Sequence, residues 1–148
     1  GGDAIGEVNT LICLGETCAA AGRTDDALAH FHAAEKVSRR IDNSYERQRA
    51  LLGVADTQCR AGRWNEALET YRSALEIARK YSYSLCSAHA LAGISRTCLS
   101  LRNVSAARAH AEDALALYQR LGVVAEAEEL RRLLAATKCT PHTLRSCS

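Results

Sequence analysis

The stretch AGRWNEALETYRSALEIARK, residues 61–80, decides the fold. Its glycine, Gly62, predicts a tight turn with a positive φ, after which a helix begins. Ala67, Tyr71 and Ala74 follow at spacings of three and four residues, so they share one face of that helix. Small residues between aromatic ones let a second helix approach closely. This face is therefore expected to pack against other helices.

The same pattern returns along the chain at a constant offset, the repeat period, which equals the separation of Gly22 and Gly62. Phe31 matches Tyr71, although the third copy has Ala111. The other matching columns are Leu11, Leu51 and Leu91; Leu14, Val54 and Ile94; Ala27, Ala67 and Ala107; and Ala34, Ala74 and Ala114. We expect the two columns that begin with Leu11 and Leu14 to form the core. A single helical pair cannot bury both of its faces, so the units are expected to stack.

Each unit is expected to hold two helices, which in the second unit run from about Tyr45 to Arg60 and from about Asn65 to Tyr81. Between them Ala67 meets the small Ala55, and Trp64 and Tyr71 are expected to fill the wider gaps on either side. The linker before this unit offers three capping candidates, Asp42, Asn43 and Ser44. In the third unit Arg102 replaces the turn glycine, and Asn103 predicts that the turn shifts by one residue.

These patterns predict an all-α fold, a solenoid of helical hairpins with three repeats and a C-terminal capping helix. The repeats are expected at about residues 3–42, 43–82 and 83–122, and the capping helix at about 123–137, which gives one domain over residues 1–137. Pro141 blocks further helix, so residues 138–148 are expected to form a flexible tail. Thr140, Thr143 and Ser146 could accept phosphate there, although no specific kinase motif surrounds them.

The repeating residues resemble the tetratricopeptide repeat. They are Gly15, Gly22, Ala27, Phe31 and Ala34 in the first unit; Ala55, Gly62, Trp64, Ala67, Tyr71 and Ala74 in the second; and Ser95, Ala107 and Ala114 in the third. The resemblance implies a right-handed superhelix of helical hairpins that serves protein interaction. The repeat period is longer than the roughly 34 residues of ordinary repeats in this family, which implies longer helices. The column in which chaperone-binding repeats carry the asparagine of their carboxylate clamp holds Glu16, Asp56 and Arg96, so that clamp is absent.

The phrase ALALYQRLGVVAEAEELRRLLA, residues 114–135, is similar to the closing repeat of actinobacterial antibiotic regulatory protein (SARP) type transcriptional activators. In those proteins DNA-binding and ATPase domains precede the repeats. The resemblance implies a C-terminal sensor domain that regulates secondary metabolism. Two alternatives stay open: a stand-alone scaffold or adaptor, and a sensor of a small ligand or peptide.

Composition argues against several function classes. A net charge of +2 without a basic run gives no footprint for nucleic acid, and no apolar stretch is long enough to span a membrane. No signal peptide opens the chain, which begins inside a helical pattern, so we expect the true start to lie upstream. The seven cysteines include no CxxC pair. They predict free thiols in a reducing cytoplasm.

The sequence shows no catalytic, metal-binding or cofactor-binding motif. No phosphate-binding loop, dinucleotide fingerprint, HExxH or GxSxG is present. Cys139, His142 and Cys147 in the tail lack a fourth ligand and a paired spacing for zinc. Carboxylate pairs such as Asp25 and Asp26 fit solvated helix faces. We therefore expect no enzyme activity, no metal and no cofactor.

Function in stacked helical repeats usually lies on the concave surface, which the first helix of each unit lines. The register of the repeats predicts that a protein or peptide partner binds there, with upstream domains of the same chain as one candidate. Arginine on such a surface can hold a carboxylate bidentately, although these charges could also serve only solubility. The proposed site residues are Asn9, Glu16, Arg49, Leu52, Asp56, Arg60, His89, Arg96 and Leu99, and Ile12, Ala19, Cys59 and Ala92 share the same face.

Overall fold

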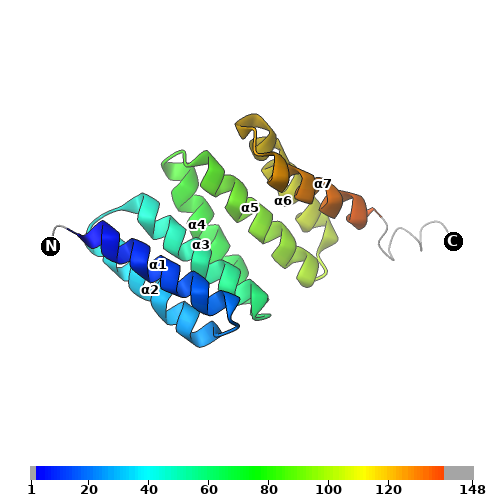
Figure 1. The fold of residues 1–148 in the computed structure, drawn as a ribbon. Coiled ribbons are helices and arrows are strands. Elements are labelled where there is room, and N and C mark those ends of the chain that lie inside the picture. Colours follow the sequence, from blue (N-terminus) through cyan, green and yellow to red (C-terminus); the bar gives the residue numbers. More distant parts are fainter. Residues whose placement is uncertain (1–2, 139–148) are drawn as a thin grey trace.

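The computed structural model describes residues 3–138, which form helices and turns without a strand (Figure 1). The helices of this part are α1 (Ala4–Ala20), α2 (Thr24–Arg40), α3 (Ser44–Arg60), α4 (Trp64–Lys80), α5 (Ser84–Ser100), α6 (Val104–Leu121) and α7 (Val124–Thr137). The all-α class and the solenoid of three hairpins with a final helix are confirmed. The expected tail lies outside the described residues, except for Lys138.

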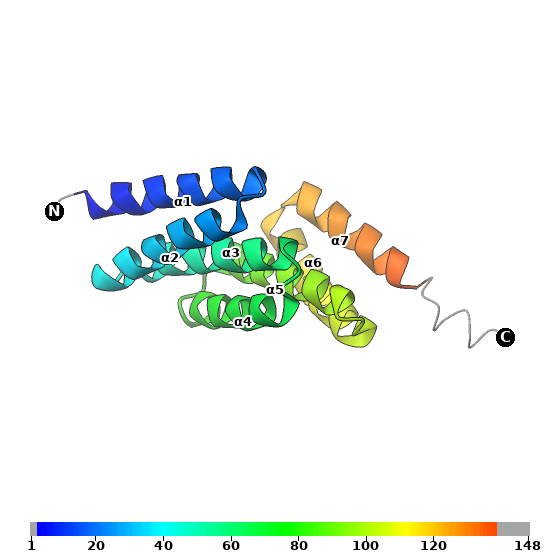
Figure 2. The same cartoon turned by 90° about the horizontal axis from the view of Figure 1, so that it is seen from below.

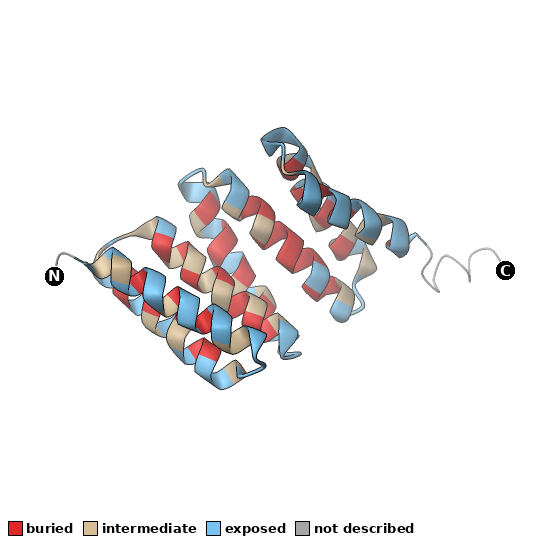
Figure 3. Cartoon of the chain, viewed as in Figure 1, coloured by how far each residue is buried: buried red, intermediate tan, exposed pale blue. Residues whose placement is uncertain are grey.

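Each helix packs against the next one along the chain, and α3 also contacts α1 and α5. The two views place α1, α3, α5 and α7 on one side of the solenoid and α2, α4 and α6 on the other (Figures 1 and 2). In Figure 2 α1 and α7 lie at the upper edge of the molecule, and α3 and α5 lie lower between them. The odd-numbered helices therefore line the concave face. Helix α5 is buried along most of its length, because α3 and α4 pack on one side of it and α6 packs on the other (Figure 3).

The turns inside the first two hairpins follow the prediction. Gly22 and Gly62 have φ values of 76° and 79°, in the left-handed region that glycine enters without strain. In the third hairpin the predicted shift is wrong, because Arg102 itself takes a φ of 64°. Asn103 serves another purpose: its side chain accepts a hydrogen bond of 3.2 Å from the backbone N–H of Ala106 and caps α6.

The capping candidate Asn43 is confirmed at the start of α3. Its Oδ1 accepts a 3.1 Å hydrogen bond from the backbone N–H of Glu46. Asp42, the residue before it, takes a positive φ of 53°, and Ser44 is already the first helical residue. The linker between the first two hairpins thus combines a left-handed residue with a side-chain cap, as the turn at Arg102 and Asn103 does.

The core is organised by an aromatic ring that lies over glycine. Phe31 of α2 is 2% exposed and lies between Gly15 of α1 and Gly53 of α3. A Cβ atom on Gly15 would lie 2.8 Å from the Phe31 ring, and one on Gly53 would lie 2.4 Å from it. One hairpin later, a Cβ on Gly93 would lie 2.3 Å from the ring of Tyr71. The glycines therefore provide the space that the rings occupy.

The third hairpin exchanges the large and small partners of this contact. Ala111 stands where the earlier hairpins have Phe31 and Tyr71, and Leu133 of α7 stands one repeat period after Gly93. Ala111 is fully buried, and the partly buried Leu133 packs against the same hydrophobic cluster. Leu133 thus fills the space that the smaller Ala111 side chain leaves empty.

Two expectations about the core are wrong. Trp64 is 38% exposed, because it is the first residue of α4 and lies beyond the close helix contact that Ala67 makes. Leu14 is 43% exposed, whereas Val54 and Ile94 in the same column are each 1% exposed. The latter two lie on helices that follow another hairpin, and no helix precedes α1 among residues 3–138.

The column that begins with Leu11 behaves as core only in part. Leu91 is buried, while Leu11 and Leu51 are half-buried.

No helix within residues 3–138 combines the length and the apolar character needed to cross a bilayer.

Replacing the two aromatic residues of the second hairpin should separate buried from exposed positions. Tyr71→Ala should lower the free energy of unfolding by about 3–5 kcal/mol, because the ring is buried and its removal leaves a cavity. Trp64→Ala should cost only roughly 1–2 kcal/mol, because less apolar surface is lost there. Urea denaturation followed by circular dichroism measures both, and equal losses would contradict the burial described above.

The ring-over-glycine contact can be tested by adding one methyl group. Gly93→Ala should destabilise the domain, because overpacking of about 1–3 kcal/mol outweighs the gain of up to about 1 kcal/mol that alanine brings to a helix. In a Tyr71→Ala background the same change should become neutral or stabilising. Gly6→Ala is the matched control, because the three atoms nearest to its Cβ all belong to the end of the exposed Asp3 side chain, which can move aside. A loss at Gly6, or none at Gly93, would contradict this account.

Candidate binding groove

Two adjoining hollows lie on the concave face. The first, of about 500 Å³, is formed by α1, α3 and α5 together with the ring of Phe31; the second, of about 390 Å³, lies among α3, α5 and α7. Asp56, Arg60 and His89 line both hollows and make them one continuous groove. A segment bound along this face would therefore contact all three hairpins and the final helix.

The structure brings most of the proposed site residues into this groove. Glu16, Arg49, Leu52, Asp56, Arg60 and His89 line the first hollow, and Arg96 joins the second. Leu52 is 8% exposed and forms part of the floor. Asn9 and Leu99 line neither hollow. Asn9 instead bonds to Arg49, and Leu99 packs against the larger core cluster.

Asp56 is held at the centre of the groove by two neighbours. The Tyr71 hydroxyl of α4 donates a hydrogen bond to Asp56 Oδ1, and His89 Nε2 of α5 lies 3.1 Å from Oδ2. This carboxylate therefore links three helices, and the Tyr71 ring that fills the glycine gap also presents its hydroxyl to the groove. The structure thus gives Asp56 a scaffolding role that reduces its freedom to bind a partner.

Electrostatics around Asp56 favour its charged form. Burial alone would raise the pKa of the carboxyl, but the hydrogen bond and charge of His89, the Tyr71 hydroxyl and the charge of Arg96 together lower it below 3.8. Burial and the neighbouring Asp56 charge raise the pKa of Tyr71, so that it stays a neutral donor. The Asp56 carboxylate is therefore ionised at neutral pH.

Arg49 is committed to contacts inside the protein. Its guanidinium donates to Asn9 Oδ1 at 3.0 Å and to Glu46 Oε2 at 2.8 Å, and it joins α1 to α3. Arg60 and Arg96 differ, because both are exposed and neither forms an ion pair or side-chain hydrogen bond within residues 3–138. These two arginines are thus the cations of the groove that can bind a partner.

Sequence reasoning missed the contribution of α7. Glu126 and Glu129 line the second hollow opposite the arginines, and the buried Tyr118 of α6 lies beneath them. Burial, with a smaller part from the charge of Glu126, raises the pKa of Tyr118 to about 12. The repeat held a signal for one of these residues, since Glu129 stands one repeat period after the proposed site residue His89. In the part of the chain that the structure describes, no group of three or more metal-binding side chains gathers.

A family model described as the tetratricopeptide repeat matches residues 6–80 and again 46–120. The chain belongs to the tetratricopeptide repeat family. This family identity agrees with the hairpin stacking and with the small and aromatic columns described above, and the fold is one that serves protein–protein interaction. No curated protein sequence matches the chain significantly.

Three solved structures share the fold at low sequence identity. The apo form of RapI matches with a TM-score of 0.84 and 16% identity, over 90% of this chain and 49% of RapI. A Rap protein in complex with Competence and Sporulation Factor matches with a TM-score of 0.84 and 17% identity, over 96% of this chain and 40% of the other. The TPR domain of Arabidopsis FLU matches with a TM-score of 0.74 and 18% identity, over 79% of this chain and 98% of the FLU domain. The chain therefore spans about half the length of RapI.

The contacts of Asp56 should make the free energy of unfolding depend on pH in the acid range. Because the folded-state pKa of Asp56 is lowered, its contribution to stability is complete above pH 3.8 and is lost as the pH falls through the folded value. Asp56→Asn should lower the free energy of unfolding by about 1–2 kcal/mol at neutral pH. The difference from wild type should shrink below about pH 3.8. Urea unfolding at a series of pH values measures it, and a difference that grows in acid would refute the assignment.

Proposed function

We propose that this tetratricopeptide repeat domain is a non-catalytic interaction module that binds a segment of a protein or peptide along its concave groove. The observation that carries the proposal is the continuous pair of hollows, lined by two exposed arginines, Arg60 and Arg96, that form no ion pair within residues 3–138. Arginine binds carboxylates through two parallel hydrogen bonds, so these residues suit an acidic group on the partner.

The two hollows are expected to bind different parts of the partner. The first has an apolar floor made by Ile12, Phe31 and Leu52, which suits an apolar side chain of the partner. The second hollow is lined mostly by charged and polar side chains, which suit orientation and specificity. A Rap protein of the same fold has been solved in complex with Competence and Sporulation Factor, which supports a bound factor as a use of such a scaffold.

We further propose that the domain is the C-terminal sensor region of a bacterial transcriptional activator of secondary metabolism. The support is the resemblance of residues 114–135 to the closing repeats of such activators. In that setting the groove would bind a partner protein or the activator's own upstream domains, and so hold or release the activator. The sequence encoded upstream of Gly1 tests this part, because a winged helix or a phosphate-binding loop there would support it.

The proposed binding groove is tested by reversing the charges of Arg60 and Arg96. Arg60→Glu with Arg96→Glu should leave helical circular dichroism and melting nearly unchanged, because exposed charges contribute under about 1 kcal/mol each. The same pair should weaken binding to a partner recovered by pull-down at least tenfold, because like charges would then face the partner's acidic group. Arg49 is left unchanged, since it joins α1 to α3.

The matched control places the same change of charge on the opposite face. Lys36→Glu with Arg72→Glu alters exposed residues of α2 and α4 that line neither hollow. Both proteins change net charge equally, so a general electrostatic effect would weaken binding in both. An affinity that falls only in the control would move the site to the convex face.

A further inference from the structure

The concave helices are joined to one another everywhere except at α7. Helix α3 is tied to α5 by three side-chain contacts: Asp56 with His89, Gln48 with Cys86, and Cys59 with Thr97. Helix α1 is tied to α3 through Arg49 and Asn9. Helix α7 packs on α6, and within residues 3–138 no side-chain hydrogen bond or ion pair joins it to α5. The space between α5 and α7 is open to a ligand.

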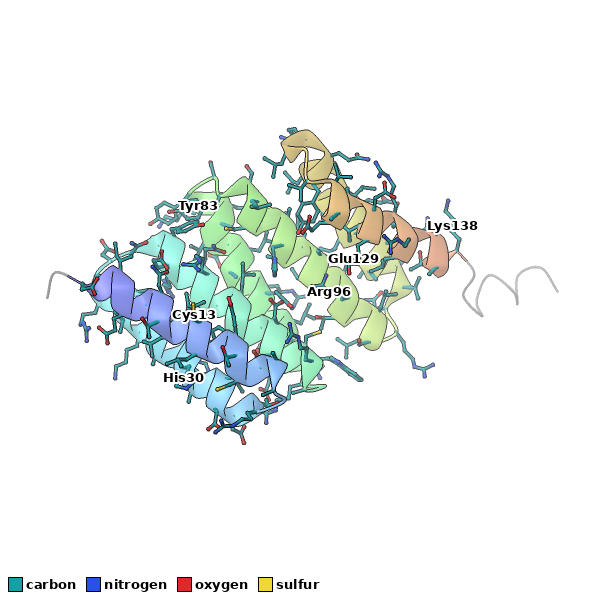
Figure 4. The ribbon with its side chains drawn as sticks, in the orientation of Figure 1. Cys13, His30, Tyr83, Arg96, Glu129 and Lys138 are labelled. Carbon is teal, nitrogen blue, oxygen red and sulfur yellow. The ribbon has the colours of Figure 1, made fainter. Side chains whose placement is uncertain are left out.

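The repeat places an opposite-charge pair across this opening. Arg96 stands one repeat period after Asp56, and Glu129 stands one repeat period after His89. The pair is therefore the equivalent of the Asp56–His89 contact, with the acidic and basic sides exchanged. Figure 4 shows Arg96 on α5 and Glu129 on the neighbouring α7. Unlike Asp56 and His89, which are 3.1 Å apart, these two form no ion pair.

Charges of each sign are grouped on separate sides of the second hollow. Arg60 and Arg96 come from α3 and α5, while Glu126 and Glu129 come from α7. Of the glutamates on α7, Glu128 is bonded to Arg131, and neither Glu126 nor Glu129 has an ion-pair partner among the described residues. A segment with acidic groups alone would meet repulsion at α7, and one with basic groups alone would meet it at α3 and α5.

We propose that the hollow between α5 and α7 binds a partner segment in which an acidic side chain and a basic side chain lie close together. The acidic group contacts Arg60 and Arg96, and the basic group contacts Glu126 and Glu129. This arrangement rests on the proposed function of the groove and adds the charge pattern of the bound segment. In an extended segment, side chains two residues apart lie on the same face, about 7 Å from each other, so such a spacing suits the two sides of the hollow.

The test uses a random peptide library passed over the immobilised domain, followed by sequencing of the retained peptides. The wild-type domain should enrich peptides with one acidic and one basic residue at a fixed spacing. Glu126→Lys with Glu129→Lys should lose the basic preference, replace it with a second acidic preference, and keep the first one. Arg60→Glu with Arg96→Glu should show the converse.

A closely matched control exists on the convex face. Glu66 is the third residue of α4 and Glu69 follows three positions later, as Glu126 and Glu129 do in α7. Glu66→Lys with Glu69→Lys should therefore leave the enriched sequences unchanged. If the variant with Glu126→Lys and Glu129→Lys still enriches peptides with the basic residue, the proposed charge pattern is wrong, although the groove remains the binding site. Enrichment by none of the proteins overturns the proposed function itself.

A second measurement asks whether the hollow is open in the free protein. Arg96→Ala and Glu129→Ala should shift the urea midpoint nearly additively when combined, because the two side chains form no ion pair and each truncation removes a charge without introducing an opposite one. A combined shift much smaller than the sum would show that Arg96 and Glu129 are bonded to each other. That result would overturn the proposal, because neither charge would then be available to a partner.

Discussion

The contact of an aromatic ring with a glycine backbone is the constraint on which the rest of the solenoid depends. Phe31 and Tyr71 can lie so close to the following helix only because Gly53 and Gly93 carry no Cβ atom. This closeness sets the distance between successive hairpins and therefore the curvature of the concave face. It also fixes the Tyr71 hydroxyl beside Asp56, so the packing of the core positions a charge in the groove.

The groove follows from how the concave helices are joined. Contacts between α1, α3 and α5 involve Arg49, Asp56 and His89. Around the second hollow, Arg60 and Arg96 on one side and Glu126 and Glu129 on α7 have no ion-pair partner among the described residues. The protein thus employs similar polar side chains for two purposes. Where a neighbouring helix is close enough they hold the scaffold, and where α7 stands apart they remain available to a partner.

The sequence predicted the features that repeat and missed those that depend on the ends of the array. The constant repeat period located the hairpins, the turns at Gly22 and Gly62, and most residues of the concave face. It failed at Leu14, because a column assigns the same burial to every copy while α1 has no preceding neighbour in the described chain. It failed at Arg102 because two residues competed for one turn, and the capping role of Asn103 prevailed. Glu126 and Glu129 were missed because α7 was interpreted as a cap alone.

The exchange of ring and glycine for Ala111 and Leu133 makes the hairpins non-equivalent. A recombined gene that repeated the second hairpin just before α7 would press Tyr71 against leucine, and one that replaced the first hairpin with a copy of the third would leave a void over Gly53. The interfaces therefore encode the order of the units as well as their shape. Tandem duplication of the second hairpin alone would keep a ring over glycine at both junctions, whereas duplication of the third would leave a void over Gly93, so only the middle unit can be copied without a compensating change.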